Sequence, residues 1–476
     1  MSFQEKKAVV LGMGETGLSM AKWLSRRGAN VRAVDSRATP PCLEALKRIL
    51  PLDRLFTGTC PAEAFAGIDL VAISPGVPLT QASVQQAVQD RIPVIGDIEL
   101  FASAIRQHGA SKPIVLGITG SNGKTTVTAM VGAMVKEAGM DVEVAGNIGP
   151  AVLNALMRRE DSGTLPQAWV LEVSSFQLET TQSLEPDAAV VLNVSEDHFD
   201  RYSGMRDYAA AKARIFKGTH VGGSEAVVQI LNRGDPIVRA MALAGRRQIT
   251  FGLDEPASDN DFGLLHGSGT TWLAQGQVRL MKTSELGIVG LHNVANALAA
   301  LALCRAVALP LPPLLRALRE FQGLPHRMEK VAAFGGITFY DDSKGTNVGA
   351  TVAALSGMMQ SVVLIAGGDG KGQDFSPLAA PIARQARAVV LMGRDAGKIG
   401  AAINHCGVPL YYVKTMEEAV QRSFDLARAG DAVLMSPACA SLDMFRNYAH
   451  RAEVFIASVR RIEAGRRAGA HPTVNS

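Results

Sequence analysis

Segment 117–126, GITGSNGKTT, carries the residue types of a phosphate-binding loop. Gly123, Lys124 and Thr125 follow one another as in the usual nucleotide-binding pattern, but the position expected to hold the first glycine is Ile118. Backbone N–H groups can surround phosphates, Lys124 can reach β- and γ-phosphate oxygens, and the Thr125 hydroxyl can bind Mg²⁺. A ligand-free turn would not require a lysine and two threonines at a helix start. The segment therefore predicts a nucleoside triphosphate site.

A second glycine-rich turn lies near the N-terminus. Gly12, Gly14 and Gly17 follow the Gly-x-Gly-x-x-Gly spacing between a predicted strand and a predicted helix, and Asp35 ends the next strand, 21 residues after Gly14. This is the dinucleotide-binding pattern in its expected context. The physical requirement is only an anion at a helix N-terminus. The pattern therefore indicates a diphosphate site more strongly than it indicates NAD, and a tight turn without a ligand is the alternative.

Other polar residues follow apolar strands, where ligands of α/β proteins bind. Glu172 ends the predicted strand WVLEV, Asp197 and His198 follow VVLNV, and Lys212 lies on a predicted helix. Taken singly, Glu172 could be a paired carboxylate, His198 a capping histidine and Lys212 a solvated lysine. For Lys212 the residues alone favour the solvated lysine. Later loops after successive strands are suited to an anionic substrate: GLPHRME, YDDSKGTN, GGDGKGQDF and SPACASLDMFRNY.

The elements that must position these residues alternate between short β-branched runs and helical patterns, which predicts an α/β fold. The strands fall into three series, separated by a polar linker at 106–113 and by Pro/Gly-rich sequence near 322. We expect three domains, 1–108, 109–322 and 323–476, each with a parallel sheet. Segment 266–287 predicts β-hairpins within the second domain.

Composition excludes several classes of protein. The 476 residues include 48 Lys and Arg against 44 Asp and Glu, without a basic block, which argues against a nucleic-acid binder. No run approaches the ~18 apolar residues of a membrane span, and no signal peptide precedes the first strand. The five cysteines are scattered, which predicts reduced thiols and a cytoplasmic protein.

Taken together, the motifs occur in the order of the Mur ligases, and the chain resembles that family over essentially its whole length. The motifs that carry the resemblance are TGSNGKTT, GNIG, LEVSSFQLE, NVSEDHFDRY, AKARIF, GLHNVANALAA, GLPHRME, DDSKGTN, GGDGKG and SPACASLDMF. The spacing of segment 117–126 is that of this family's phosphate loop. SPGVP, DSKGTN and SPACASLD resemble the D-glutamate-adding members, and the D-N-P-R motif of diaminopimelate-adding members is missing.

The resemblance implies three domains: a Rossmann-like N-terminal domain, a central domain with a P-loop ATPase-type parallel sheet, and a Rossmann-like C-terminal domain. It also implies a monomer that uses ATP to add D-glutamate to UDP-N-acetylmuramoyl-L-alanine (UDP-MurNAc-L-Ala) in peptidoglycan precursor synthesis. The substrate carboxylate would become an acyl phosphate, which the D-glutamate amine then attacks. Two Mg²⁺ ions would assist, and CO₂ would convert Lys212 to a carbamate.

Residue roles carry over motif by motif. The residues implied for catalysis are Lys124, Glu172, His198 and Lys212. The residues implied as metal ligands are Thr125, Glu172, His198 and Lys212. Those implied for ATP are Ser121, Asn122, Gly123, Lys124, Thr125, Thr126, Val127, Asn293, Asn296, Arg327 and Asp342. Those implied for the UDP substrate are Glu15, Thr16, Asp35, Ser36, Arg37, Ser74, Gly76 and Asn147. Those implied for D-glutamate are Lys344, Thr346, Ser441 and Tyr448, with Lys371 in a loop nearby.

Two departures from the family pattern affect fine substrate contacts: Ala452 replaces an expected glycine, and Tyr448 stands where phenylalanine is equally expected. Three other readings stay open. An NAD-dependent dehydrogenase would leave the second loop and Glu172 without a role. A GTPase-like switch would require an N-K-x-D motif, which is missing. Another Mur ligase or a folate polyglutamate ligase would share the ATP chemistry but take a different amino acid.

Overall fold

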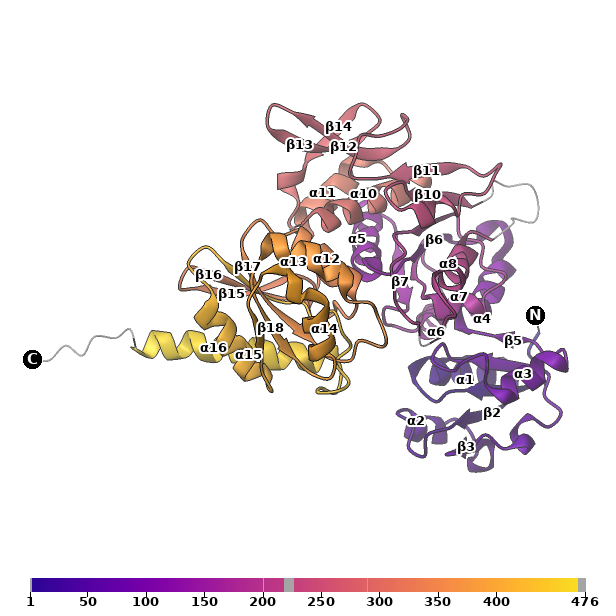
Figure 1. The fold of residues 1–476 in the computed structure, drawn as a ribbon. Coiled ribbons are helices and arrows are strands. Elements are labelled where there is room, and N and C mark those ends of the chain that lie inside the picture. Colours follow the sequence, from indigo (N-terminus) through magenta and orange to yellow (C-terminus); the bar gives the residue numbers. More distant parts are fainter. Residues whose placement is uncertain (1, 200, 218–226, 289, 470–476) are drawn as a thin grey trace, which may run out of the picture.

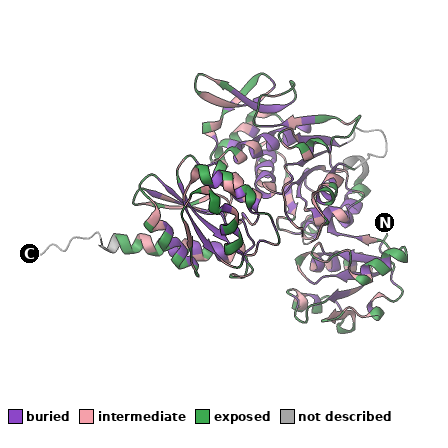
Figure 2. Ribbon diagram, viewed as in Figure 1, coloured by how far each residue is buried: buried purple, intermediate pink, exposed green. Residues whose placement is uncertain are grey.

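The computed structural model describes residues 2–199, 201–217, 227–288 and 290–469. They form three α/β parts, each built around its own sheet (Figure 1). In every part the strands are largely buried while the outer helix faces are exposed (Figure 2). This confirms the predicted three-part α/β architecture. Within the described residues, no helix is long and apolar enough to cross a membrane.

The first sheet is wholly parallel, with strand order β3-β2-β1-β4-β5. The order reverses between β1 and β4, and doubly wound sheets bind ligands at such a point. The strands are β1 (Lys7–Leu11), β2 (Asn30–Asp35), β3 (Leu55–Thr57), β4 (Leu70–Ile73) and β5 (Val94–Ile95). The helices are α1 (Glu15–Arg26), α2 (Leu43–Lys47), α3 (Ala82–Gln89) and α4 (Asp97–Ile105).

Helix α4 joins the first part to the central part through packing. All nine of its residues are buried, and the Phe101 ring meets the Trp169 ring edge-on at 4.9 Å between centroids. One hydrophobic cluster consequently includes residues of α1, α4, α6 and the central sheet. Arg27, which directly follows α1, forms a salt bridge of 2.6 Å with Glu160 of α6. The first and central parts therefore share a core.

The central sheet has nine strands in the order β14-β13-β12-β11-β10-β9-β6-β8-β7. It is parallel from β7 to β12, and β13 and β14 add the predicted antiparallel hairpins at one edge. The strands are β6 (Ile114–Thr119), β7 (Val142–Gly146), β8 (Ala168–Glu172), β9 (Ala188–Val191), β10 (Val228–Asn232), β11 (Gln248–Phe251), β12 (Phe262–Gly267), β13 (Thr270–Gln275) and β14 (Val278–Lys282).

Both faces of this sheet are covered, so its central strands are continuous apolar runs. On β8, Trp169 and Leu171 pack into the core shared with α4 and α6, whereas Ala168 and Val170 face the core of α5, α10 and α11. The helices are α5 (Lys124–Glu137), α6 (Val152–Asp161), α7 (Ser175–Glu179), α8 (Met205–Ala213), α9 (Pro236–Arg239), α10 (Leu291–Ala306) and α11 (Leu311–Glu320).

The C-terminal sheet has the order β15-β16-β20-β17-β18-β19, parallel except for the edge strand β15. Helices α12, α13 and α14 contribute to the core on one face, and α15 and α16 to the core on the other. The strands are β15 (Glu329–Phe334), β16 (Ile337–Asp341), β17 (Val362–Gly367), β18 (Ala386–Met392), β19 (Leu410–Tyr412) and β20 (Ala432–Met435). The helices are α12 (Val348–Ser356), α13 (Ala379–Gln385), α14 (Ala396–Ile403), α15 (Met416–Leu426) and α16 (Tyr448–Gly469). In Figure 1, α12 faces the central part near α5 and α10.

Candidate active site

The predicted phosphate loop connects β6 to α5. Gly123 has φ +84°, in the left-handed region, and a Cβ there would lie 2.5 Å from the Asn296 Oδ1 atom. Glycine is therefore required both for the backbone conformation and for close approach to α10. The loop ends where α5 begins, so the first backbone N–H groups of the helix point out of the N-terminus and can bind an anion.

Residues after β9 hold this loop in place. The Asn193 side chain accepts a hydrogen bond from Asn122 N at 2.8 Å and donates one to Asn122 O at 3.0 Å. The Ser121 hydroxyl accepts from Ser195 N at 3.0 Å and donates to Ser195 O at 3.1 Å. These contacts hold the loop against the segment that follows β9. Asn193 and Ser195 both belong to the motif NVSEDHFDRY, but neither was predicted as a site residue.

Two lysines converge on one carbonyl of the loop. Lys124 Nζ donates to Gly120 O at 2.9 Å, and Lys212 Nζ donates to the same oxygen at 2.8 Å. Burial, reinforced by the neighbouring Lys124, lowers the pKa of Lys212 well below its usual range. Burial also lowers the pKa of Lys124. Lys212 is 1% exposed, so the solvated-lysine interpretation is wrong. Helix periodicity could not predict this, because the burial comes from packing of α8 against the loop.

Glu172, at the end of β8, lies beside this loop and is buried. Its Oε1 atom accepts a hydrogen bond of 2.6 Å from the Asn147 side chain. Its Oε2 atom is buried and has no hydrogen-bond partner among the described residues. A buried carboxylate oxygen without a partner is costly, and a hard cation would compensate for it.

His198 occupies a turn after β9 with φ +58°. Its Nε2 atom lies 3.6 Å from Asp197 Oδ2, and its ring meets the Phe176 ring edge-on at 4.6 Å. Burial lowers the pKa of His198 against the opposing effect of Asp197, and Lys371 and Lys124 act in the same direction as burial. This shift favours the neutral imidazole, which is the form that binds metals.

A cavity of about 340 Å³ lies between the central and C-terminal parts, beside the phosphate loop. Among the residues predicted for ATP, those that line it are Asn122, Gly123, Thr126, Asn293, Asn296, Arg327 and Asp342. Ser121, Lys124, Thr125 and Val127 belong to the adjoining loop and the first turn of α5. Lining residues that sequence reasoning missed include Asn232, Asp235, Phe251 and His292. Asn232, Asp235 and Phe251 lie at two strand ends and a helix start outside the motifs quoted above, and His292 lies in GLHNVANALAA beside the predicted Asn293.

Contacts between the central and C-terminal parts complete this cavity. Arg327 Nη2 donates to Thr125 Oγ1 at 2.8 Å, and the Asn347 side chain bonds to Asn122 and Asp197. Burial raises the pKa of the Asp342 carboxyl to about 7, although it accepts a hydrogen bond from Ser436. The cavity is therefore formed by residues more than 200 positions apart in sequence.

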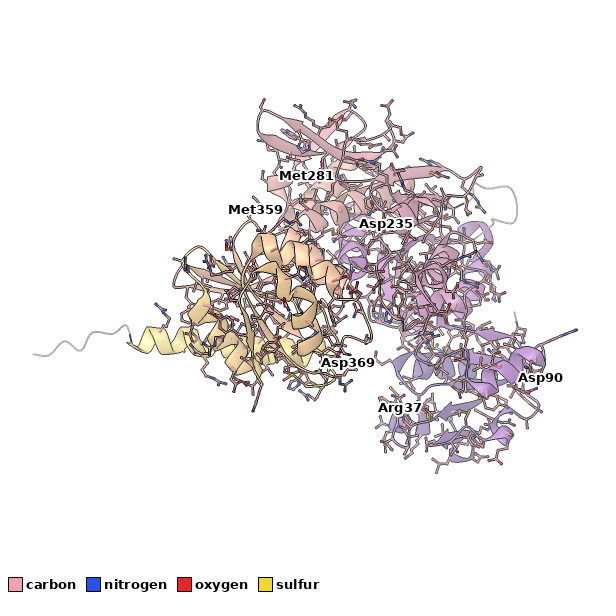
Figure 3. The ribbon with its side chains drawn as sticks, viewed as in Figure 1. Arg37, Asp90, Asp235, Met281, Met359 and Asp369 are labelled. Carbon is pink, nitrogen blue, oxygen red and sulfur yellow. The ribbon has the colours of Figure 1, made fainter. Side chains whose placement is uncertain are left out.

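A second cavity, of about 570 Å³, lies at the switch point of the first sheet. All eight residues predicted for the UDP substrate line it: Glu15, Thr16, Asp35, Ser36, Arg37, Ser74, Gly76 and Asn147. Gly17 allows α1 to approach β1, since a Cβ there would lie 1.7 Å from Gly12 O. Figure 3 shows Arg37, at this cavity, well separated from Asp235 at the first one.

Asp35 is already engaged within this second cavity. Its carboxylate accepts hydrogen bonds from Met13 N at 2.7 Å and from the Arg37 guanidinium at 2.6 and 2.9 Å. The hydrogen bonds from Arg37 lower the pKa of Asp35 to about 2. In a dinucleotide-binding protein this acid is available for a ribose hydroxyl. Here Arg37 covers the Asp35 carboxylate: the Asp35 side chain is 4% exposed and the Arg37 side chain 54%, so Arg37 is the more accessible of the two at the cavity.

The residues predicted for D-glutamate lie around loops of the C-terminal part. Lys344 Nζ stands 5.3 Å from the centroid of the Tyr448 ring, and burial lowers the pKa of Lys344 to about 8. Thr346 follows in the same loop and donates its backbone N–H to Lys344 O. Ser441 is buried in the segment between β20 and α16. The structure thus brings Lys344, Thr346 and Tyr448 together, with Ser441 in the loop that leads to Tyr448.

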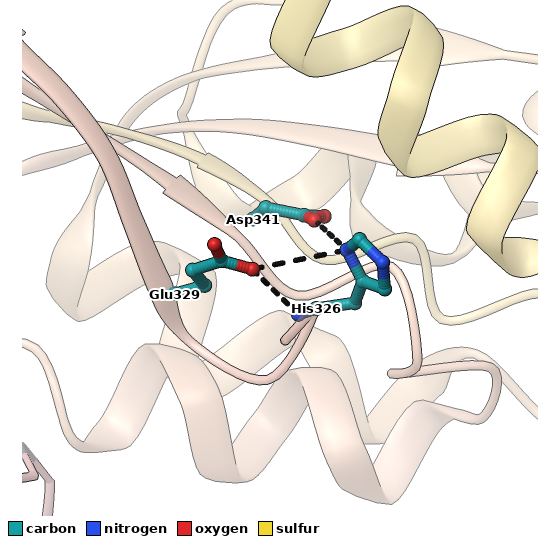
Figure 4. A group of neighbouring side chains, drawn as sticks. All are labelled: His326, Glu329 and Asp341. Carbon is teal, nitrogen blue, oxygen red and sulfur yellow. Dashed lines mark hydrogen bonds and ion pairs between the residues drawn. The ribbon is translucent and has the colours of Figure 1, made fainter. Parts of the chain in front are cut away.

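A histidine–carboxylate cluster supports this region (Figure 4). His326 Nδ1 lies 2.7 Å from Asp341 Oδ2, and His326 N donates to Glu329 Oε2 at 2.8 Å. The His326 carbonyl accepts from Lys344 N, and its ring faces Tyr448 at 6.3 Å. The polar atoms of the cluster pair with one another, which favours a supporting role over a metal site.

Comparison with known proteins agrees with this geometry. Three family models match: the Mur ligase MurD-like N-terminal domain over residues 6–96, the Mur ligase middle domain over 118–304, and the Mur ligase glutamate ligase domain over 326–439. Similar proteins include the UDP-N-acetylmuramoylalanine--D-glutamate ligases of Nitrosospira multiformis (68% identical, covering 98% of both chains) and Nitrosomonas europaea (62% identical, covering 97% of this chain and 98% of the relative).

Solved structures show the same fold. UDP-N-acetylmuramate-alanine ligase MurC from Thermotoga maritima is 20% identical, with a TM-score of 0.58 over 96% of this chain and 99% of its own. A pseudomurein peptide ligase type C from Methanothermus fervidus is 19% identical, with a TM-score of 0.57 over 96% and 100%. At these identities the likeness concerns the fold alone. From the family models and the relatives above 60% identity, the chain belongs to the Mur ligase family.

Proposed function

We propose that this chain is an ATP-dependent ligase that adds D-glutamate to UDP-MurNAc-L-Ala, a step of peptidoglycan precursor synthesis. The observation that carries the proposal is the bridge between the two cavities. Asn147 lines the first-domain cavity and hydrogen-bonds to Glu172, which adjoins the phosphate loop of the nucleotide cavity. A substrate held in one cavity can thereby present its carboxylate to a phosphate held in the other.

ATP would occupy the cavity beside the phosphate loop. Its phosphates would lie over residues 121–127 at the N-terminus of α5, with Lys124 on the β- and γ-oxygens, and Asn293, Asn296, Arg327 and Asp342 would surround the nucleoside. Because Arg327 reaches the loop from the C-terminal part, the two parts must stay together during phosphoryl transfer. Lys124 and the loop N–H groups would offset the negative charge that develops there.

The residues present fit Mg²⁺. Glu172 offers a buried oxygen without a partner, Thr125 a hydroxyl, and His198 a neutral imidazole. We infer two ions, one held by Thr125 and Glu172 and one by His198 and a modified Lys212. When bound, Mg²⁺ neutralises phosphate charge and brings anionic groups together. Neighbouring residues orient two of these ligands. Asn147 hydrogen-bonds to the Glu172 carboxylate, and Asp197 and Phe176 contact the His198 ring.

Lys212 would serve as a carbamate. A lysine ammonium has only donors and repels cations, so the unmodified side chain cannot be a ligand. The lowered pKa makes the neutral amine accessible, and this amine can add to CO₂. The nitrogen forms a bond to carbon, one C=O bond opens to an oxyanion, and the nitrogen releases a proton. The product carries two hard oxygens at the same position.

The first-domain cavity would bind the uridine diphosphate sugar rather than NAD. An anion can approach the start of α1 because the space beside Gly14 is open: a Cβ there would meet no protein atom within 4 Å. The L-alanyl carboxylate would then take the γ-phosphoryl group. The amine of D-glutamate, held by Lys344, Thr346, Ser441 and Tyr448, would attack the acyl carbon, and phosphate would leave. We assign these tasks to domains 1–108, 109–322 and 323–476 of a cytoplasmic monomer.

A phosphate-release assay tests this proposal. The chain should release phosphate from ATP only when UDP-MurNAc-L-Ala, D-glutamate and Mg²⁺ are all present. Tight NAD binding without binding of the UDP sugar would instead favour a dehydrogenase. A rate of phosphate release that does not depend on the UDP sugar would contradict the proposed reaction.

A further inference from the structure

Arg201 lies between the first and central parts, outside the predicted site residues. Its Nη1 atom donates to Pro75 O at 2.6 Å, and its Nη2 atom forms a 2.6 Å ion pair with Glu179 Oε2 at the end of α7. The guanidinium also lies over the Phe176 ring, 4.2 Å from its centroid. The Arg201 and Glu179 side chains are only 13% and 14% exposed.

Each contact leads to a different part of the proposed site. Pro75 belongs to the Ser74–Gly76 turn, which lines the first-domain cavity. The Phe176 ring that Arg201 covers also meets the His198 ring edge-on. The backbone N–H groups of Arg201 and Tyr202 donate to His198 O at 2.9 and 3.1 Å. One residue therefore contacts the substrate turn and the turn that holds His198 in its left-handed conformation.

The planar guanidinium suits this task. It donates from two separate nitrogens while lying over an aromatic face, whereas a lysine ammonium offers all its donors from a single nitrogen. Because the pair with Glu179 is largely shielded from water, it is less screened than a surface salt bridge. Removing Arg201 would leave the Pro75 carbonyl without this donor and Glu179 without its counter-ion.

We propose that Arg201 is a positioning residue that couples the Ser74–Gly76 turn of the UDP-sugar cavity to His198. The identity of the substrate rests on the proposed function above. Through this link, the turn is held at a fixed place relative to the phosphate loop, and His198 is held at its place against Phe176. Loss of Arg201 weakens binding of the UDP sugar and slows turnover, but leaves the ATP cavity unchanged, since Arg201 does not line it.

The test compares Arg201→Gln and Arg201→Lys with Arg214→Gln in the full chain. Arg214 is a matched control, because it also braces α7, donating to Leu178 O at 2.6 Å and Thr181 O at 2.8 Å. These acceptors both lie in the central part. Steady-state phosphate release gives KM for UDP-MurNAc-L-Ala, KM for ATP and kcat for each variant.

We expect Arg201→Gln to raise KM for UDP-MurNAc-L-Ala at least tenfold and to lower kcat, with KM for ATP within twofold of the parent. Arg201→Lys should recover part of the loss, and Arg214→Gln should leave KM for the UDP sugar unchanged. Equal effects of the Arg201 and Arg214 variants, or an equal rise in both KM values, would overturn the proposal. If Arg201→Gln does not fold, the same comparison is made with Arg201→Lys, which should raise KM for UDP-MurNAc-L-Ala more than it raises KM for ATP. An inactive parent chain would instead contradict the proposed function.

Discussion

Asp97 offers a quantitative test of how the first and central parts are joined. It is the first residue of α4 and is 1% exposed, and its carboxylate accepts hydrogen bonds from the Gln177 side chain at 3.0 and 3.3 Å. Burial raises the pKa of Asp97 from 3.8 to about 6, against the opposing effect of the Gln177 hydrogen bonds. Replacing Asp97 with asparagine removes the charge and keeps a similar shape.

The direction of the pH effect on folding stability follows from the difference in proton binding between the folded and unfolded states. The folded protein holds the Asp97 proton more tightly than the unfolded chain, so raising the pH through the range from about 4 to 6 destabilises the folded state. The elevation of the pKa corresponds to a cost of about 3 kcal/mol once the carboxylate is ionised in both states. Asp97→Asn does not incur this cost, and other titrating groups contribute equally to both proteins.

Urea unfolding from pH 4 to pH 8 measures the effect. The free energy of unfolding of Asp97→Asn minus that of the parent should rise by roughly 2–3 kcal/mol over this range. The comparison uses the transition that melts the core around Phe101 and Trp169. A difference that stays constant from pH 4 to pH 8 would refute the reasoning, because Asp97 would then carry no burial penalty.

Three further predictions concern the reaction. Lys124→Ala should keep its circular dichroism spectrum but lose at least ~10²-fold in phosphate release; near-parental turnover would contradict the ATP assignment. Arg37→Ala should weaken calorimetric binding of UDP-MurNAc-L-Ala by roughly 10- to 100-fold; unchanged binding would remove Arg37 from the site. Lys212→Ala should be inactive and partly restored by acetate, and Lys212→Arg should stay inactive; an active arginine variant would exclude the carbamate.

The sequence predicts the fold well because its strands are short apolar, β-branched runs that alternate with helical patterns and are bounded by Gly and Pro. Segment 117–126 also identifies its loop from glycine, lysine and threonine alone. The eight residues assigned to the UDP sugar through the family resemblance all line one cavity. The two successes have different causes: a phosphate loop needs fixed residue types at fixed spacing, whereas the UDP-sugar residues follow from the resemblance to the Mur ligases.

Burial and contacts between domains could not be predicted in the same way. Lys212 reads as a solvated helix lysine until α8 packs against the phosphate loop. Asn193 and Asn347 lie in the motifs NVSEDHFDRY and DDSKGTN, but their residue type alone does not predict that both contact Asn122. The role of Arg201 depends on its hydrogen bond to the Pro75 carbonyl, which belongs to another domain. Such roles depend on which loops meet, and no local pattern carries that information.

The amino acid that the chain accepts tests the central claim most directly. The chain would be incubated with ATP, Mg²⁺, UDP-MurNAc-L-Ala and an equimolar mixture of D-glutamate, L-glutamate, L-lysine, L-alanine and diaminopimelate, and the products identified by mass spectrometry and chiral analysis. The account predicts one product, the UDP sugar extended by D-glutamate. A product that carries another amino acid, or phosphate release without any extended UDP sugar, would contradict it.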